Sequence, residues 1–419
     1  MKEEEETKSK FVPVTKIMVY EAYKKVKANR GGAGVDSMSI KEFDENAGKN
    51  LYKIWNRLAS GSYFPPPVKE VEIPKKDGKM RKLGIPTVGD RIAQTVIKDY
   101  LEPEIDKLFH QNSYGYRPGR SAHNALEQVR QNCQEYGWVI DLDIRGFFDN
   151  IDHELLMLAI DKHTQEKWVK MYIRRWLEMP IEKANGERIC KEGRGTPQGG
   201  VISPLLANLF LHYAFDKWME KEYSEIKFER YADDIIVHCK TENQAEYILD
   251  KIRKRMTECN LELHAEKTKI VFCKGYGRKA DYANIKFNFL GYSFQPRITK
   301  TRAGKHFVNF DLAISREAKN KIVEEFRRMR FHRMSTSTIE DVANLLNPKL
   351  RGWILYYGKY RRYEMKYIFA RLSERLVRWL HFRYKQLKRS VKKGYEWLRK
   401  IYLKKPKLFV HWQYGFKEY

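Results

Sequence analysis

Two adjacent carboxylates, Asp233 and Asp234, lie in the stretch Tyr231-Ala-Asp-Asp234 of this 419-residue chain. A strand-like run precedes them and the β-branched run Ile235-Ile-Val237 follows, so we expect the pair at the tip of a β-hairpin. Two neighbouring acids on a turn repel each other unless a cation lies between them. Mg²⁺ prefers oxygen ligands and bridges carboxylates to substrate phosphates, so this pair is a candidate metal site.

Such a site needs a second acidic strand, and the segment Trp138-Val-Ile-Asp-Leu-Asp143 provides one. Residues two apart on a strand point to the same face, so Asp141 and Asp143 face one way. An Asp-Asp pair by itself is usually a solvated loop. Together with the second strand, the pattern predicts a metal site in which Asp141 and Asp143 are both candidate ligands.

The segments that must position these acids are typical of an α+β body followed by helices. Alternating or short apolar runs predict strands, and longer periodic runs predict helices. After residue 300, apolar residues recur at helical spacing behind Ser315, a good N-cap, and again beside a row of arginines. The predicted strands are 68–73 and 138–143, and the predicted helices include 92–101, 244–256, 315–329 and 368–380.

The charge balance favours a polyanionic partner. The chain has 81 Lys and Arg against 54 Asp and Glu, a net charge of +27, and residues 301–419 hold 30 of these bases with only 10 acids. Phosphate neutralisation makes nucleic acid the leading partner. The longest apolar run, near Leu205 to Phe215, is too short to cross a membrane. The N-terminus has no signal or transit character, so we expect a cytoplasmic location without membrane association.

Eight short segments follow one another in an order typical of one family. They are Ala33-Gly-Val-Asp36, Val71-Glu-Ile-Pro-Lys75 with Arg81-Lys-Leu-Gly-Ile-Pro-Thr87, Ser113-Tyr-Gly-Tyr-Arg-Pro-Gly-Arg120, Asp143 with Phe148, Gly195-Thr-Pro-Gln-Gly-Gly-Val-Ile-Ser-Pro204, Tyr231-Ala-Asp-Asp234, Glu266-Lys-Thr-Lys269 and Phe289-Leu-Gly-Tyr292. Their order and wording resemble the reverse transcriptase domain of group II intron-encoded proteins. Residues 346–357 and 407–412 are similar to the thumb and maturase region of the same family.

This resemblance implies a right-hand polymerase fold. Its parts would be fingers, a palm with an antiparallel sheet and the Tyr-Ala-Asp-Asp hairpin, and a basic α-helical thumb and maturase region. The expected bounds are 1–60 for an N-terminal extension, 61–135 for the fingers, 136–298 for the palm, 299–390 for the thumb and maturase domain (domain X), and 391–419 for a basic, aromatic tail. Many relatives continue into a Cys/His-bearing endonuclease module, whereas this sequence stops at Tyr419, so we expect no cleavage of target DNA by the chain itself.

The resemblance also implies roles for the acids. In that family the metal-binding acid of the first palm strand stands five residues before an aromatic gate, which selects Asp143 and Phe148. An aromatic ring against the sugar of the incoming nucleotide leaves no room for a 2′-hydroxyl. The implied metal ligands are Asp143, Asp233, Asp234 and the backbone of Ile144, around two Mg²⁺ ions that Mn²⁺ can replace, with Asp141 and Asp149 as secondary candidates.

Further residues are implied to bind the substrates. Lys75 and Arg81 flank the turn signal Lys76-Asp-Gly78, so a hairpin would bring both cations to one end, where the family holds the triphosphate. A lysine in the matching segment of the family assists the pyrophosphate leaving group. The complete set is Lys75, Arg81, Phe148, Gln198, Gly199 and Lys267 for the nucleotide, and Arg117, Arg120, Gly291 and Tyr292 for primer and template.

The sequence therefore predicts an RNA-directed DNA polymerase that uses two-metal-ion nucleotidyl transfer, encoded by a group II intron and aiding the splicing and mobility of that intron as a maturase. The expected partners are an RNA template, a DNA or RNA primer, dNTPs and structured intron RNA, with no obligate protein partner evident. Two alternatives stay open. One is a stand-alone reverse transcriptase in phage defence or beside a CRISPR array. The other is a non-catalytic RNA-binding splicing factor, against which the intact acids Asp143, Asp233 and Asp234 argue.

Overall fold

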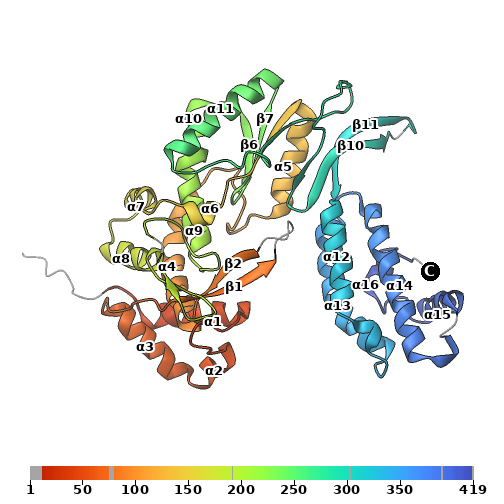
Figure 1. Ribbon diagram of the computed structural model, residues 1–419, viewed down its shortest axis with the longest axis horizontal. Coiled ribbons are helices and arrows are strands. Elements are labelled where there is room, and N and C mark those ends of the chain that lie inside the picture. The colour runs from red at the N-terminus through yellow and green to blue at the C-terminus, as the bar shows by residue number, and fades with distance from the viewer. Residues whose placement is uncertain (1–11, 75–79, 191, 302, 388–389, 418–419) are drawn as a thin grey trace, which may run out of the picture. The chain divides into compact units, whose positions relative to one another are not determined.

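The computed structural model of the protein describes residues 12–74, 80–190, 192–301, 303–387 and 390–417 (Figure 1). The chain forms two compact units, one of residues 1–129 with 139–270 and the other of residues 130–138 with 271–419. Helices and strands are mixed in both units, as the α+β prediction required. This division is coarser than fingers, palm and thumb, so the bounds of those parts stay predictions.

The first unit begins with helices that pack beside a β-hairpin. Thr87 caps α4 by accepting a hydrogen bond from the backbone N of Asp90 at 3.1 Å. β1 and β2 pair antiparallel, with Ile73 opposite Arg81, and this confirms the strand predicted at 68–73. The elements are α1 (Lys16–Asn29), α2 (Ile40–Glu45), α3 (Ala47–Ala59), β1 (Val68–Pro74), β2 (Met80–Ile85) and α4 (Val88–Ile105), and the short strands β4 (Ile181–Glu182) and β5 (Arg188–Ile189) extend the sheet in the order β2-β1-β4-β5.

A four-stranded sheet carries the predicted acids. Its order is β6-β7-β3-β8, and the strands are β3 (Trp138–Leu142), β6 (Lys227–Tyr231), β7 (Asp234–Cys239) and β8 (Lys269–Phe272). Consecutive residues of β7 are buried from Ile235 to Cys239, which is typical of a strand covered on both faces. The neighbouring helices are α5 (Ala122–Glu135), α6 (Phe147–Asn150), α7 (His153–Asp161), α8 (Lys167–Leu177), α9 (Ser203–Leu211), α10 (Lys217–Glu222) and α11 (Glu242–Glu258).

A single π-helical turn, His212–Asp216, joins α9 to α10. Such wider turns are rare inside helices and occur often at functional sites. Both its first and its last residue are buried. The turn matters because Asp216 is the buried partner of an arginine at the base of the acidic hairpin, as described below.

The second unit joins a three-stranded antiparallel sheet, in the order β11-β10-β9, to a helical bundle. Ser315 caps α12 by accepting a hydrogen bond from the backbone N of Ala318 at 3.1 Å, as predicted. The predicted apolar faces of α12 and α14 are buried in one core with Phe326 and Trp379. The elements are β9 (Phe287–Phe289), β10 (Tyr292–Lys300), β11 (His306–Ile314), α12 (Arg316–Arg328), α13 (Ile339–Tyr357), α14 (Lys366–Arg383), α15 (Val391–Lys404) and α16 (Val410–Gln413).

In the described ranges, no helix combines enough apolar residues with enough length to cross a membrane.

Candidate active site

Asp233 and Asp234 lie at the tip of the β6–β7 hairpin, as predicted. Tyr231 pairs with Asp234 across the antiparallel ladder, so Ala232 and Asp233 form a two-residue loop. Ala232 has φ +58°, in the left-handed region that residues other than glycine rarely adopt. Tight two-residue hairpin loops require such a value at their first position. The turn thus holds Asp233 half-buried and leaves Asp234 exposed at the start of β7.

A fully buried arginine, Arg230, supports this turn through hydrogen bonds. The Arg230 guanidinium donates from Nε and Nη2 to the two carboxylate oxygens of Asp216, at 2.8 and 2.5 Å. Its Nη1 donates to Asn208 Oδ1 at 2.9 Å and to the carbonyl oxygen of Ala232 at 3.1 Å. Bidentate pairing fixes the guanidinium plane, so the bond to Ala232 fixes the loop that carries Asp233.

The segment Ser113–Arg120 packs against the same turn. The backbone N of Tyr114 donates to the carbonyl oxygen of Arg230 at 2.8 Å, and Asn208 Nδ2 donates to the carbonyl oxygen of Gly115 at 2.7 Å. A Cβ at Gly115 would lie 2.4 Å from the backbone N of Ala232, which is closer than real Cβ contacts come. Only glycine allows this approach. Sequence reasoning missed Arg230 and its partners, although an arginine within an otherwise buried strand was a usable signal.

Asp141 experiences the charges of Asp143 and of Asp234 in the hairpin. Burial raises the pKa of Asp141 to about 7, with further increases from the charges of Asp234 and Asp143 and a decrease from Lys269. The strand order β6-β7-β3-β8 places the hairpin beside β3, so the acids predicted on the two segments lie on neighbouring strands of one sheet.

The donor chemistry of this site fits a hard divalent cation. Carboxylate oxygens are the ligands that Mg²⁺ and Mn²⁺ accept, and mutual repulsion among the acids is relieved by a cation. Within the described ranges, no three Asp, Glu, His or Cys side chains already converge as a metal-ligand group. The site is a set of acids on two neighbouring strands of one sheet.

Lys267 lies at the edge of the acids. Its Nζ is 3.7 Å from Asp143 Oδ2, and both side chains are partly exposed. The segment that carries Lys267 is attached to the end of β3. The backbone N of His264 donates a hydrogen bond to the carbonyl oxygen of Asp143 at 2.8 Å, and Leu263 forms an isolated antiparallel β-bridge with Ile144. The buried Thr268 accepts from the backbone N of Asp143 at 3.3 Å. Lys267 thus lies where it can meet negative charge beside Asp143.

The predicted gate, Phe148, lies beside the glycine-rich loop, which is the segment 195–200. Phe148 is half-buried in α6 against Phe147, with ring centroids 5.4 Å apart, and its carbonyl oxygen accepts from the backbone N of Thr196 at 2.8 Å. Gln198 Nε2 is 3.4 Å from Asp149 Oδ2, so the amide is beside the residue that follows Phe148. This neighbourhood suits a nucleotide-binding role for both side chains.

Buried hydrogen bonds connect α4 to the glycine-rich loop. Gln94 Oε1 accepts from the backbone N of Val201 at 2.7 Å, while its Nε2 donates to Asp90 Oδ2 at 2.9 Å. Tyr63 and Trp176 each donate to Asp90 Oδ1 at 2.9 Å. Burial raises the pKa of Asp90 from its ordinary value of 3.8 to about 6, although these three donors oppose the shift. No local sequence pattern indicated these buried hydrogen bonds.

Gly199 is placed by a strand contact. It has φ +122°, and a Cβ there would lie 2.4 Å from the carbonyl oxygen of Gly84 in β2. The backbone N of Gly84 donates to the carbonyl oxygen of Gln198 at 2.7 Å. The loop is therefore joined to the strand that also carries Arg81. Lys75 lies outside the described residues, and the described part of Arg81 is its backbone pairing in β2.

The two arginines predicted to contact primer or template have different surroundings. The Arg117 side chain is 6% exposed and ion-pairs with Asp106 at 2.7 Å. Its other donors reach the carbonyl oxygens of His110 and Ser113, both at 2.8 Å, so the guanidinium organises its own loop. Arg120 is exposed, with its guanidinium 5.7 Å from the centre of the Tyr114 ring. Of the pair, Arg120 is the one presented to solvent.

Gly291 and Tyr292 belong to the second unit. Leu290 and Gly291, at φ +49° and +80°, form the two-residue turn between β9 and β10. The Tyr292 side chain is fully buried, and its hydroxyl donates to the carbonyl oxygen of Tyr356 in α13. Burial raises the pKa of Tyr292, with smaller increases from nearby tyrosines including Tyr356. Tyr292 thus anchors the sheet to the bundle within this unit, and its ring is not presented to solvent.

The chain is similar in sequence to known proteins. The family described as "Reverse transcriptase (RNA-dependent DNA polymerase)" matches residues 73–294, and the "Group II intron, maturase-specific domain" matches residues 319–397. Group II intron-encoded protein LtrA of Lactococcus lactis is 28% identical over 85% of this chain and 71% of its own length. Protein YkfC of Escherichia coli is 30% identical over 62% of this chain and 74% of its own.

Among solved structures, the telomerase of Candida albicans, in complex with a fragment of telomeric RNA, aligns with 90% of this chain and 68% of its own at 11% identity and a TM-score of 0.46. The reverse transcriptase family covers more than half of the chain, including the acids of both strands, the gate and the glycine-rich loop. The resemblance predicted from the eight segments is thereby confirmed. The chain belongs to the reverse transcriptase family, and it joins a reverse transcriptase domain to a group II intron maturase-specific domain.

Proposed function

We propose that the chain synthesises DNA on an RNA template and that Asp143, Asp233 and Asp234 hold the catalytic divalent metal ions, with Asp141 beside them. The observation that supports this most directly is the strand order β6-β7-β3-β8, which places β3, with Asp141 in it and Asp143 just after it, beside the hairpin that carries Asp233 and Asp234. Divalent ions at such a site would activate a primer 3′-hydroxyl and neutralise the triphosphate. Two Mg²⁺ ions are the proposed complement, and Mn²⁺ is a proposed substitute.

The residues around the acids receive proposed roles in binding the nucleotide. Phe148 would press on the sugar and exclude a 2′-hydroxyl, while Gln198 and the backbone at Gly199 would meet the nucleotide or the template strand. Lys267 would stabilise charge on the leaving pyrophosphate. Lys75 and Arg81 keep their proposed role at the triphosphate; Arg81 pairs with Ile73 in the β1–β2 hairpin, and Lys75 lies outside the described residues.

Two of the four residues predicted to contact primer and template keep that proposed role. Arg120 is retained because its guanidinium is exposed, and Gly291 because its turn allows close backbone approach. Arg117 and Tyr292 are proposed as supports of their loops, since their polar groups are already bonded within the protein. The proposed parts remain fingers at 61–135, palm at 136–298, and thumb and maturase region from 299 onward.

We further propose that the maturase-specific domain binds structured group II intron RNA and aids its splicing. The match over residues 319–397 and the similarity to an intron-encoded protein support this. A splicing assay that combines the protein with the intron RNA of its own locus tests the role. Absence of such an intron around the gene would favour a stand-alone reverse transcriptase.

Primer extension on an RNA template with dNTPs and Mg²⁺ tests the polymerase directly. Asp143→Asn and Asp233→Asn should each lower the extension rate by at least about a thousandfold, because each removes a charged ligand from a metal-dependent site. Binding of template and primer should stay within about twofold. Glu262→Gln is the matched control, since it removes an exposed acid from the neighbouring segment. Extension at the wild-type rate by Asp233→Asn would contradict the catalytic assignment.

A further inference from the structure

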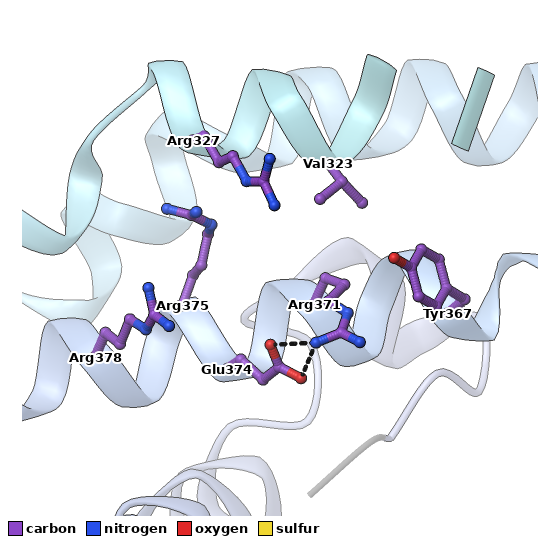
Figure 2. A pocket seen from close by; sticks show the side chains of 7 residues that line it. All are labelled: Val323, Arg327, Tyr367, Arg371, Glu374, Arg375 and Arg378. Carbon is purple, nitrogen blue, oxygen red and sulfur yellow. Dashed lines mark hydrogen bonds and ion pairs between the residues drawn. The ribbon is translucent and has the colours of Figure 1, made fainter. Parts of the chain in front are cut away.

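A cavity of about 410 Å³ opens between α12 and α14 in the second unit. It is lined by Val323 and Arg327 of α12 and by Tyr367, Arg371, Glu374, Arg375 and Arg378 of α14 (Figure 2). Its volume is in the range of small-molecule sites, about 300–1,000 Å³, but such sites are mainly apolar. A cavity lined by four guanidinium groups calls for a highly anionic occupant.

The helical pattern explains how the arginines gather. Arg371, Arg375 and Arg378 stand at positions i, i+4 and i+7 of α14, so they share one face. The opposite face, with Leu372 and Trp379, is buried in the bundle core. Figure 2 shows Arg375 reaching from α14 toward α12 and Arg327 pointing from α12 into the same gap.

Acids within the protein neutralise only part of this charge. Glu374 accepts two hydrogen bonds from Arg371 Nη1, at 2.8 and 2.9 Å, and Glu324 pairs with Arg327 at 3.0 Å. Among the described residues, no acid forms an ion pair with Arg375 or Arg378. Two unneutralised guanidinium groups on adjacent turns thus face one cavity.

Burial and like charges both disfavour the charged form of Arg375. Burial lowers its pKa first, the charges of Arg378 and Arg327 lower it further, and those of Glu324 and Glu374 raise it. Burial also lowers the pKa of His332, followed by the charges of Arg375, Arg333, Arg378 and Arg330. Arginine stays protonated in proteins, so Arg375 keeps its charge and is repelled by Arg378 and Arg327. A bound anion would relieve that repulsion.

The groove continues beyond the arginines. An adjoining cavity of about 480 Å³ shares Val323, Arg327 and Tyr367 with the first and extends to Lys321 on α12. Tyr367 is 46% exposed, and its ring lies 5.2 Å from the Arg371 guanidinium. An exposed aromatic ring beside clustered cations is the combination with which proteins hold single-stranded nucleic acid, bases on the ring and phosphates on the cations.

We propose that this groove binds an unpaired segment of RNA, with backbone phosphates against Arg375, Arg378 and Arg327 and a base stacked on Tyr367. Stacking on Tyr367 requires a base that is free of its partner strand, which favours a loop or a single-stranded junction over a duplex. The choice of RNA over other polyanions rests on the proposed function. The residues proposed to bind the metal ions and the nucleotide lie in other segments of the chain.

The test compares two variants that lose the same charge. Arg375→Gln/Arg378→Gln removes the unneutralised pair, and Lys392→Gln/Lys393→Gln removes two exposed cations at the start of α15. Binding of a fluorescent, unstructured 12-nucleotide RNA is measured by anisotropy across a KCl series. The groove variant should bind about tenfold more weakly, with a salt slope lower by about 1.4, since each single-strand phosphate contact contributes about 0.7. The control should lose less than about threefold.

Further variants separate the groove from general charge effects. Tyr367→Ala should weaken RNA binding and Tyr367→Phe should not, because stacking needs only the ring. Glu374→Gln should strengthen binding by freeing Arg371. Equal losses for the groove and control variants, or equal losses on a 12-base-pair RNA duplex, would overturn the proposal. Preferential binding of poly-glutamate would also overturn it and point to an acidic protein partner.

Primer extension on a pre-annealed template and primer keeps the two proposals apart. The groove variant should extend at the wild-type rate. If the wild-type protein does not extend but the groove variant still loses RNA binding selectively, the polymerase proposal fails and the groove proposal stands. If the wild-type protein extends and the groove variant binds like the control, the groove proposal alone fails.

Discussion

Arg230 touches no substrate in the proposed chemistry, yet its side chain sets the position of Asp233. Four of its hydrogen bonds go to Asp216, Asn208 and the carbonyl oxygen of Ala232, and the last of these holds a loop in a left-handed conformation. A buried charge without its partner is strongly destabilising. Arg230 is therefore a positioning residue whose role in stability and role in catalysis must be separated by experiment.

Arg230→Met should lower the free energy of unfolding by roughly 3–5 kcal/mol, because Asp216 is left buried and unpaired. It should also lower kcat for dNTP incorporation while KM for dNTP changes little. Urea unfolding and steady-state primer extension measure the two effects. The double variant Arg230→Met/Asp216→Leu should regain stability but not kcat, since Ala232 still lacks its donor. Recovery of kcat in the double variant would show that Arg230 acts on stability alone.

Phe148 is the second residue whose effect is expected to be specific. Phe148→Ala should raise incorporation of ribonucleotides relative to deoxynucleotides by at least about tenfold, because the shortened side chain no longer excludes the 2′-hydroxyl. Single-nucleotide extension with each substrate gives the ratio. Phe148→Tyr keeps the ring and should keep the discrimination. An unchanged ratio in Phe148→Ala would remove the residue from this role.

At the scale of elements, α4 reaches the active-site loop through a buried chain of polar groups. Asp90, in the first turn of α4, is bonded to Gln94, and Gln94 accepts from the loop that follows Gly199. Because the pKa of Asp90 is raised in the folded protein, its protonated form is favoured on folding. Its contribution to stability is full below about pH 3.8 and is lost as the pH rises through about 6.

The contribution of Asp90 to the free energy of unfolding should fall by roughly 3 kcal/mol between pH 3.8 and about 6, because this carboxyl group is fully buried. Asp90→Asn should remove this component, so its free energy of unfolding should depend less on pH between 4 and 7 than that of the wild type. Urea unfolding at pH 4.5, 5.5 and 7 measures both dependences. The exposed acid Asp250 in α11 offers the control Asp250→Asn, which should leave the wild-type dependence in place. Parallel curves for wild type and Asp90→Asn would contradict the assignment.

Several elements could be predicted from sequence because their signals are local. The alternation at 68–73, the Ser315 cap and the apolar rows of α12 and α14 each depend on residues within a few positions of one another. The hairpin at Asp233 was predictable for the same reason. The supports of that hairpin were not, because Asn208, Asp216 and Gly115 reach it from distant segments and through a π-helical turn that no local pattern indicates.

The candidate site shows the same limit. The type of each acid and the family motifs identified Asp143 and Asp233 as candidates, but only the fold shows that burial, and then the charges of Asp234 and Asp143, raise the pKa of Asp141. Arg117 was assigned to nucleic acid from its motif, and its burial against Asp106 depends on a loop conformation that the sequence does not specify. Residue types are thus easier to predict than the partners that decide their availability.

At the scale of the whole molecule, charge is distributed unevenly along the chain. Residues 301–419 have 30 Lys and Arg against 10 Asp and Glu, while the protein as a whole has a net charge of +27. The proposed metal ligands lie within the first 300 residues, whereas most of the excess positive charge lies after them. Binding of RNA and the chemical step should respond differently to ionic strength.

Affinity for a structured RNA should fall by at least about a thousandfold between 50 and 200 mM KCl, as for proteins that neutralise six or more phosphates. The rate of single-turnover extension from a pre-formed complex should change by less than about threefold over the same range. Filter binding and rapid quench measure the two quantities. A small salt dependence of affinity would show that the excess of bases is a solvated surface and not a binding surface.

The close approach of Gly115 to Ala232 has a consequence for the history of such genes. The two residues lie in separate segments, yet no side chain larger than hydrogen fits at one while the other keeps its turn. Replacement of Gly115 in a decaying gene copy should therefore accompany loss of polymerase activity, even where every acid is intact. Assays of naturally diverged copies would show whether loss of this glycine accompanies loss of polymerase activity.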